Sequence, residues 1–198
     1  MAAIRLIVGL GNPGPRYAGT PHNVGADCVE ALSMRFGIRL AEDQRIKGRI
    51  GRGLIVHHDV RLLIPSTFMN LSGECVGAVA TFYKYAPAEI LILHDEMAFE
   101  PGVVRLKIGG GHNGHNGLRD IIGALGNDAS FARLRIGVGH PGDRDRVSGF
   151  LTGARMPADA RRKVAQACEF SDALLDLICA GEFLKAMNHL HTAADGDD

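Results

Sequence analysis

Residues 90–93 read Ile-Leu-Ile-Leu, a short run without a polar residue. A strand with one face in water alternates apolar and polar side chains, whereas an unbroken apolar run is typical of a central strand covered on both faces. A chain with such a strand needs packing layers on both sides of its sheet. The 198 residues are enough for one domain with a sizeable core.

Strand-like and helix-like segments alternate along the chain. Strands are predicted at 4–10, 46–57, 60–65, 90–94, 103–108 and 134–138, with 46–57 and 60–65 forming a hairpin around His58-Asp59. Helical spacing covers 22–37, 76–83, 118–125 and most of 157–190. This alternation predicts an α/β fold, a single-domain three-layer sandwich with a mixed, twisted β-sheet flanked by helices. We expect the domain to span 1–192 and residues 193–198 to form a disordered tail.

The charges balance overall but not along the chain. The sequence has 22 basic and 22 acidic residues, a balance that excludes a protein coated with positive charge. Residues 105–163 nevertheless carry eleven basic and five acidic groups, and residues 164–198 carry one basic and seven acidic groups. Either these are two solvated faces, or the basic stretch meets phosphate and the acidic segment offsets it.

Nothing in the sequence predicts a membrane or secreted protein. No apolar run approaches the ~18 residues of a membrane helix, and the N-terminus leads straight into a strand without the pattern of a signal peptide. The four cysteines are far apart and lack a CxxC pair, so we expect free thiols in a reducing cytoplasm, without disulfides or zinc.

Residues 9–14, Gly-Leu-Gly-Asn-Pro-Gly, match the GxGxxG pattern of dinucleotide-binding loops. That function needs a helix that starts on the glycines and offers its amides to a pyrophosphate. Pro13 and Pro15 remove two amide donors, and the next helical pattern begins only after Pro21. The alternative is a tight loop that presents Asn12 at the carboxyl end of a strand.

His22 and Asp95 are the residues best placed for acid–base chemistry. His22 lies at the entry to the first helix, just past the Asn12 loop, and histidine suits general-base work near neutral pH. Asp95 ends the most apolar strand, where a carboxylate can accept a hydrogen bond from an imidazole and fix its tautomer. A structural role for either residue alone is the simpler alternative.

Asparagines recur where loops enter helices, at Asn12, Asn23, Asn70 and Asn116. An amide both donates and accepts, so such a set suits hydrolysis by an activated water without a metal or a covalent intermediate. For Asn70 or Ser72 taken alone, a helix N-cap is the favoured interpretation. Residues 109–117 are rich in glycine, and metal binding by His112 and His115 is disfavoured because the sequence places no acidic or cysteine partner nearby.

Taken together, these motifs resemble the bacterial-type peptidyl-tRNA hydrolases. The matching segments are 8–14 with Tyr17, 22–25, 65–73, 94–96, 109–118 and 133–139, in order along the chain. The resemblance implies a small, monomeric, cytoplasmic α/β enzyme without a cofactor. It would cleave the ester between a nascent peptide and the tRNA 3′ end, which recycles tRNA from aborted translation.

The resemblance also implies a role for each matching residue. His22 would activate a water molecule, and Asp95 would orient the His22 imidazole. Asn70 would lie near the oxyanion, and Asn116 would help to place the water. The remaining substrate-binding positions are Asn12, Tyr17, Asn23 and Phe68. The positions that grip the tRNA acceptor-stem phosphates are Arg105, Lys107, His115 and Arg135, in the basic stretch.

The sequence departs from the family pattern at a few positions. Pro21 stands where an arginine is usual, Asn113 replaces a glycine, and Met97-Ala98 is atypical after the acidic pair. None of these changes removes a proposed catalytic residue. A non-catalytic RNA-binding relative is the alternative from another class, although a binding module has no need of His22 and Asp95.

Overall fold

The computed structural model describes residues 1–194. Its strands are β1 Leu6–Gly9, β2 Ala41–Asp43, β3 Gly48–Ile55, β4 His58–Pro65, β5 Ile90–Glu96, β6 Val104–Ile108 and β7 Ala132–Gly137. Its helices are α1 Val24–Arg35, α2 Ser72–Tyr83, α3 Asn116–Ala124, α4 Val147–Thr152, α5 Ala158–Ala167, α6 Asp172–Cys179 and α7 Phe183–Ala194.

The seven strands form one mixed sheet in the order β2-β3-β4-β1-β5-β7-β6. The four central strands are parallel, because β1 pairs with β4 and β5, and β5 pairs with β7, in that sense. The outer pairs β2–β3, β3–β4 and β6–β7 are antiparallel. The carboxyl ends of β1 and β5 therefore lie side by side at one edge of the sheet, where α/β proteins place their sites.

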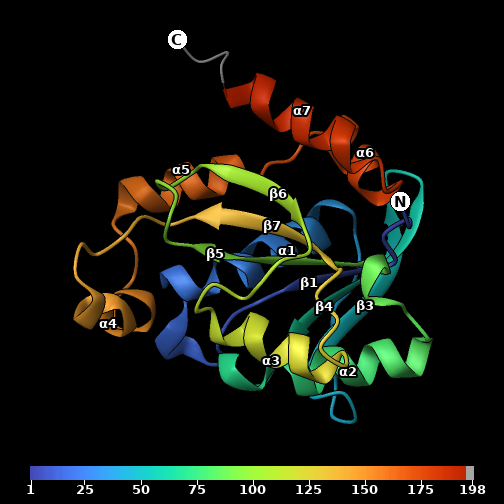
Figure 1. The fold of residues 1–198 in the computed structure, drawn as a ribbon, viewed down its shortest axis with the longest axis horizontal. Helices are drawn as coiled ribbons and strands as arrows, with labels where there is room; N and C mark the ends of the chain where they lie inside the picture. The colour runs from blue at the N-terminus through green and yellow to red at the C-terminus, as the bar shows by residue number, and fades with distance from the viewer. Residues whose placement is uncertain (195–198) are drawn as a thin grey trace.

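The apolar strand β5 lies in the middle of the sheet and is buried along its whole length. Ile90 and Ile92 pack into the core between the sheet and helices α2 and α3. Leu91 and Leu93 pack into the core on the opposite face, between the sheet and α1 with the C-terminal helices. Figure 1 shows α2 and α3 below the sheet and α5, α6 and α7 above it. The predicted three-layer sandwich is confirmed.

Some boundaries differ from the predictions. The turn of the predicted hairpin, between β3 and β4, is at Val56 and His57, so His58 and Asp59 already belong to β4. The polar His-Asp pair resembles a turn signal, whereas Val56 is a β-branched residue that adopts a positive φ of 56° there. The short elements β2 and α4 carry no sequence signal and are missed. Two residues of the predicted tail, 193 and 194, lie in α7, and the other four lie outside the described residues.

The cysteines also correct the sequence analysis. A disulfide joins Cys28 of α1 to Cys168 at the end of α5, two positions 140 residues apart in the sequence. Cys75 and Cys179 are free and buried, and burial raises the pKa of each thiol to about 12. Neither free thiol is poised to be a nucleophile. Within residues 1–194, no helix is long and apolar enough to cross a membrane.

Candidate active site

The loop after β1 is fixed to the start of α1 by asparagine side chains. Asn12 donates its backbone N–H to Asn23 Oδ1 at 2.8 Å, and Asn23 Nδ2 donates to the Asn12 carbonyl at 3.0 Å. Asn12 Oδ1 in turn accepts from the backbone N–H of Met69 at 2.8 Å. The Asn23 amide is thus occupied by the loop itself, which makes Asn23 a positioning residue for the Asn12 loop.

A glycine brings His22 next to Asp95. At Gly25, in the first turn of α1, a Cβ atom would come within 2.1 Å of the Leu93 carbonyl oxygen of β5. Only glycine allows this close approach of helix and strand. His22 lies just before this turn, in a buried 3₁₀ turn over Pro21–Asn23, and so reaches the end of β5.

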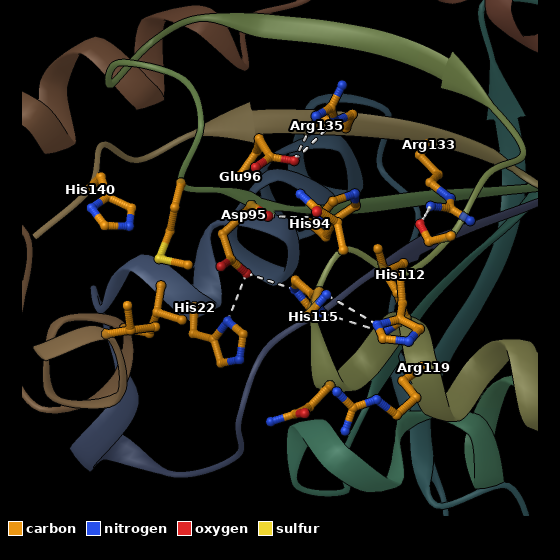
Figure 2. A pocket seen from close by; sticks show the side chains of 18 of the residues that line it. His22, His94, Asp95, Glu96, His112, His115, Arg119, Arg133, Arg135 and His140 are labelled. Carbon is orange, nitrogen blue, oxygen red and sulfur yellow. Dashed lines mark hydrogen bonds and ion pairs between the residues drawn. The ribbon is translucent and has the colours of Figure 1, made fainter. Parts of the chain in front are cut away.

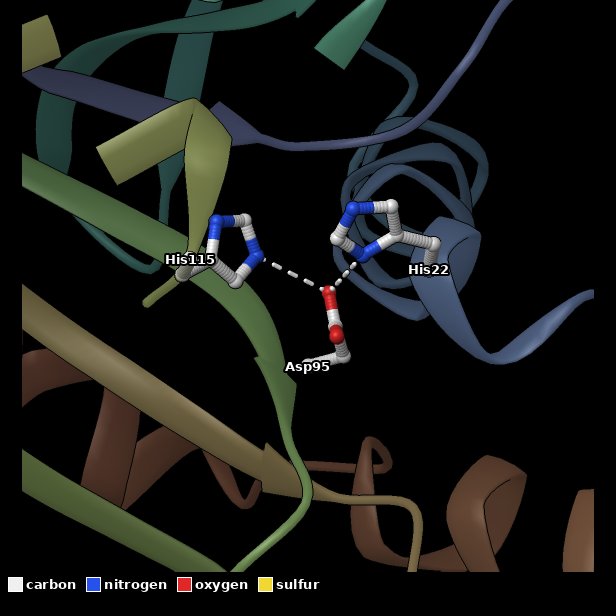
Figure 3. A group of neighbouring side chains, drawn as sticks. All are labelled: His22, Asp95 and His115. Carbon is white, nitrogen blue, oxygen red and sulfur yellow. Dashed lines mark hydrogen bonds and ion pairs between the residues drawn. The ribbon is translucent and has the colours of Figure 1, made fainter. Parts of the chain in front are cut away.

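Asp95 accepts hydrogen bonds from two imidazoles (Figure 3). His22 Nδ1 lies 2.7 Å from Asp95 Oδ1, and His115 Nε2 lies 3.0 Å from the same oxygen. Three distant segments meet here: the entry to α1, the end of β5 and the residue that caps α3. The sequence predicted the contact of His22 with Asp95 but not the participation of His115.

The hydrogen bonds assign different roles to the two imidazoles. His115 Nδ1 accepts from the backbone N–H of Leu118 and caps α3, so the proton of the neutral ring lies on Nε2 and is donated to Asp95. Both nitrogens of His115 are therefore engaged. His22 donates Nδ1–H to Asp95, which leaves a lone pair on Nε2, the nitrogen directed away from the carboxylate. Of the two, only His22 can take a proton from a substrate or a water.

The carboxylate of Asp95 stays charged in spite of its burial. Removal from water raises the pKa of Asp95, but the neighbouring rings of His115 and His22, through charge and hydrogen bonds, outweigh this effect and hold it below its ordinary value of 3.8. A permanent negative charge lies beside His22 and stabilises an imidazolium there.

His94 is a buried histidine that sequence reasoning did not single out. Its Nδ1–H donates to the backbone carbonyl of Asp95 at 2.7 Å, and its ring meets that of His115 edge to face at 5.0 Å. Burial, together with the nearby His115, lowers the pKa of His94 to about 3. The ring is therefore neutral, and its Nε2 has no hydrogen-bond partner among the described residues.

A cavity of about 1090 Å³ opens beside this group (Figure 2). His22, Asp95, His115 and Asn116 line it, together with the segment from His140 to Thr152 that includes α4. The basic residues of its lining are Lys107, Arg119, Arg133, Arg135 and Arg144. All five come from the basic stretch 105–163, so the fold gathers that charge excess around one cavity.

The remaining predicted substrate-binding residues lie beside the cavity and do not line it. Asn70 is exposed in the 3₁₀ turn Met69–Leu71, which packs against the start of α3 so closely that a Cβ at Gly117 would come within 2.5 Å of Met69 Sδ. The rings of Tyr17 and Phe68 meet edge to face at 6.2 Å, with Phe68 half exposed. Tyr17 and Phe68 thus form an aromatic edge, and the exposed amide of Asn70 lies next to the Asn12 loop through the bond of Met69 to Asn12.

Four cations share one face of β6 and β7. In this antiparallel pair Arg105 lies opposite Arg135 and Lys107 lies opposite Arg133. Like charges directly opposite each other destabilise a sheet, so the arrangement favours an anion over this face. Arg135 is partly neutralised, because it donates two hydrogen bonds to Glu96 Oε2 at 3.0 and 2.9 Å. Arg105 and Lys107 retain more of their positive field.

Arg133 is buried and holds the glycine-rich loop, a role that the sequence did not reveal. Its guanidinium donates to the carbonyls of Gly110 and Gly111 and stacks over the Phe131 ring, 4.7 Å from its centroid. Burial, with the charge of Arg135, lowers the pKa of Arg133. Arg133 thus anchors the loop that leads to His115. The resemblance places His115 beside the phosphates, but the structure commits both of its nitrogens to Asp95 and Leu118.

The geometry bears on two other kinds of site. The chain after Gly9–Gly14 forms a 3₁₀ turn over Pro15–Tyr17, and α1 begins only at Val24, so α1 does not start on these glycines as dinucleotide binding requires. The first turn of α1 packs against them instead, and Ala26 donates its backbone N–H to the Leu10 carbonyl at 2.9 Å. For metal binding, the sequence places no acidic partner near His115, but the fold supplies Asp95. The ligand atoms of His22, Asp95 and His115 lie within 4.8 Å of one another and form a possible metal-binding group.

Comparison with known proteins gives a consistent result. A family model described as peptidyl-tRNA hydrolase matches residues 6–197. The peptidyl-tRNA hydrolase of Azotobacter vinelandii is 50% identical over 192 residues, and that of Haemophilus influenzae is 47% identical over 192 residues. Each alignment covers 97% of this chain and 98% of the relative. A crystal structure of peptidyl-tRNA hydrolase from Acinetobacter baumannii matches with a TM-score of 0.91 and 48% identity, over 96% of this chain and 95% of that one. This chain therefore belongs to the peptidyl-tRNA hydrolase family.

Proposed function

We propose that this protein hydrolyses the ester bond between the peptide and the 3′ end of tRNA in peptidyl-tRNA, with water activated by His22 as the nucleophile. The observation that carries the proposal is the single carboxylate oxygen of Asp95, which accepts from His22 Nδ1 at 2.7 Å and from His115 Nε2 at 3.0 Å. Of the two imidazoles bonded to Asp95, only His22 keeps a free basic nitrogen, and His22 lies at the wall of a large basic cavity.

The reaction begins with a proton transfer. His22 Nε2 takes a proton from a water molecule as the water oxygen forms a bond to the ester carbonyl carbon. The imidazolium that forms is stabilised by Asp95, whose carboxylate accepts Nδ1–H. Asn116, at the start of α3 and on the cavity wall, is suited to hold the water with its amide.

The second step releases the products. The carbonyl oxygen of the ester carries the negative charge of the tetrahedral intermediate, and we assign the exposed amide of Asn70 as a donor to it. The intermediate collapses when the bond between the acyl carbon and the ribose oxygen breaks. His22 returns its proton to that oxygen, so the products are a peptide with a free carboxyl group and a tRNA with a free ribose hydroxyl.

Binding of the two halves of the substrate uses different surfaces. The edge formed by Tyr17 and Phe68, with the Asn12 loop beside it, offers apolar area and amides to the peptide and the 3′ end. Arg105 and Lys107, with Arg135 partly neutralised beside them, offer charge to the acceptor-stem phosphates. A clamp of a few cations selects a phosphate-bearing substrate without base readout. We further propose that the protein acts as a monomer in the cytoplasm.

The direct test measures release of tRNA from an N-acetyl-aminoacyl-tRNA by the purified protein, compared with release from the corresponding aminoacyl-tRNA. We expect hydrolysis of the acetylated substrate and little of the free one. His57→Ala serves as a control for loss of an imidazole elsewhere in the protein, because His57 is exposed and does not line this cavity, and it should retain full activity. Tight tRNA binding without hydrolysis would favour the alternative of a non-catalytic RNA-binding relative.

Acid quench during a single turnover tests the absence of a covalent intermediate. We expect free peptide and no peptide attached to the protein at any time point. Mass spectrometry of the quenched protein provides the readout. A transient peptidyl-enzyme would contradict direct attack by water.

A further inference from the structure

A second group of histidines and a carboxylate lies outside the cavity. His57 in the hairpin turn and His58 at the start of β4 both approach Asp176 of α6. His57 Nε2 lies 3.2 Å from Asp176 Oδ1, and His58 Nε2 lies 2.7 Å from the same oxygen. His58 and Asp176 are 118 residues apart in the sequence, so the fold alone creates this group.

The backbone of the turn makes this convergence possible. Successive side chains of an extended strand point to opposite faces, so adjacent histidines in a strand cannot share a partner. Here the turn begins at Val56, which adopts a positive φ of 56°, a conformation that is unfavourable for a β-branched residue. The two rings that follow lie together, with centroids 4.3 Å apart and planes inclined by 32°.

The spacing of the three ligand atoms suits a transition-metal ion. His57 Nε2, His58 Nε2 and Asp176 Oδ1 lie within 4.8 Å of one another. Around a tetrahedral ion with bonds of about 2.0–2.1 Å, ligand atoms lie about 3.3 Å apart. Two imidazoles and one carboxylate form a mixed nitrogen–oxygen donor set that suits Zn²⁺. The same donor set also accepts Ni²⁺ or Cu²⁺.

We propose that His57, His58 and Asp176 bind one zinc ion at the protein surface. The side chain of His57 is 70% exposed and that of Asp176 is 41% exposed, so the ion has an open path and a position left for water. His58 is 20% exposed and anchors the site to β4. The ion would cross-link the β3–β4 turn to α6 and stabilise the docking of the C-terminal helices on the sheet. The proposal does not depend on the proposed function, because none of these residues lines the cavity.

The experiment is a calorimetric titration of ZnSO₄ into the full-length protein, in which the His22→Ala variant serves as the background. That background removes one of the three ligands of the possible metal-binding group around Asp95 and so weakens zinc binding in the cavity. Zinc at the surface is then identified by the loss of its binding when His57 or Asp176 is changed. His57→Ala is the decisive change, because so exposed a side chain can be truncated without loss of the fold. Asp176→Asn is the second change, and thermal unfolding without metal confirms that both variants are folded.

We expect one zinc ion per chain in the His22→Ala background. The Kd for zinc should rise at least about tenfold when His57→Ala or Asp176→Asn is added. Removal of a residue that only hydrogen-bonds to a metal ligand already lowers metal affinity by roughly 10- to 100-fold, and removal of a ligand should cost at least as much. Zinc should raise the Tm of the background protein and not that of the double variants. Absence of zinc binding in the background would overturn the proposal, and so would binding that survives both changes.

Discussion

Replacement of Asp95 by asparagine tests how much of the rate depends on its charge. Both imidazoles bond to the same oxygen, Oδ1, at 2.7 and 3.0 Å. An asparagine can present its carbonyl oxygen at that position and keep both hydrogen bonds. The substitution therefore removes the negative charge with little change in geometry.

The expected loss follows from the position of that charge. An imidazolium on His22 and the carboxylate have charge centres about 4 Å apart, which is worth about 4 kcal/mol at an effective dielectric constant of about 20. This attraction develops only when His22 takes the proton, so it stabilises the transition state and not the bound substrate. Since about 1.4 kcal/mol corresponds to a tenfold change in rate, kcat should fall about 10³-fold.

The assay is release of tRNA from N-acetyl-aminoacyl-tRNA, with kcat and KM determined for Asp95→Asn and for Asp159→Asn, a matched change at an exposed site on α5. KM should change little, because Asp95 is buried and Arg105 and Lys107, not Asp95, are the residues proposed to contact the phosphates. Asp159→Asn should match the wild type. The reasoning is refuted if folded Asp95→Asn protein retains kcat within about a factor of ten of wild type, because the Coulomb term of about 4 kcal/mol would then be absent.

Three further predictions follow from the same structure. Arg105→Ala combined with Lys107→Ala should raise KM, leave kcat unchanged and reduce the salt dependence of tRNA binding by about two units of slope, and an unchanged KM would remove these residues from the clamp. Because the pKa of His94 is lowered from 6.5 to about 3, the unfolded chain binds a proton between these pH values that the native protein does not, so stability falls as pH decreases from about 6.5. Urea unfolding at pH 7 and pH 5 should therefore show a smaller acid-induced loss for His94→Asn than for wild type, and equal losses would contradict the assignment. EDTA should leave hydrolysis unchanged, and a loss that zinc restores would instead assign the group of His22, Asp95 and His115 to a catalytic metal.

The architecture could be predicted because local patterns determine it. The apolar run in β5 requires cover on both faces, and the alternation of periods two and 3.6 supplies helices between parallel strands. The positions of His22 and Asp95 follow from the same reasoning, since both lie where β1 and β5 end at one edge of the sheet. The failure at the β3–β4 turn comes from Val56, a β-branched residue with a positive φ, whereas α4 is too short to produce a helical pattern in the sequence.

The rest of the site depends on long-range contacts that sequence spacing does not encode. His115 reaches Asp95 from the end of a glycine-rich loop whose carbonyls are held by Arg133, a residue 18 positions further along the chain. The disulfide between Cys28 and Cys168 joins segments 140 residues apart, and the spacing of the cysteines in the sequence does not indicate this pairing. The composition was informative only by segment, because the net charge of zero conceals the basic residues that the fold gathers around one cavity.

The most direct test of the proposed mechanism is single-turnover hydrolysis by His22→Ala, measured together with the affinity of this variant for tRNA. Of the two imidazoles bonded to Asp95, only His22 has a free basic nitrogen, and Arg105 and Lys107 are the residues proposed to bind the phosphates. We therefore expect that hydrolysis is abolished while the Kd for tRNA stays close to that of the wild type. Hydrolysis at a near-normal rate, or loss of tRNA binding as the cause of inactivity, would contradict the role of His22 as the base.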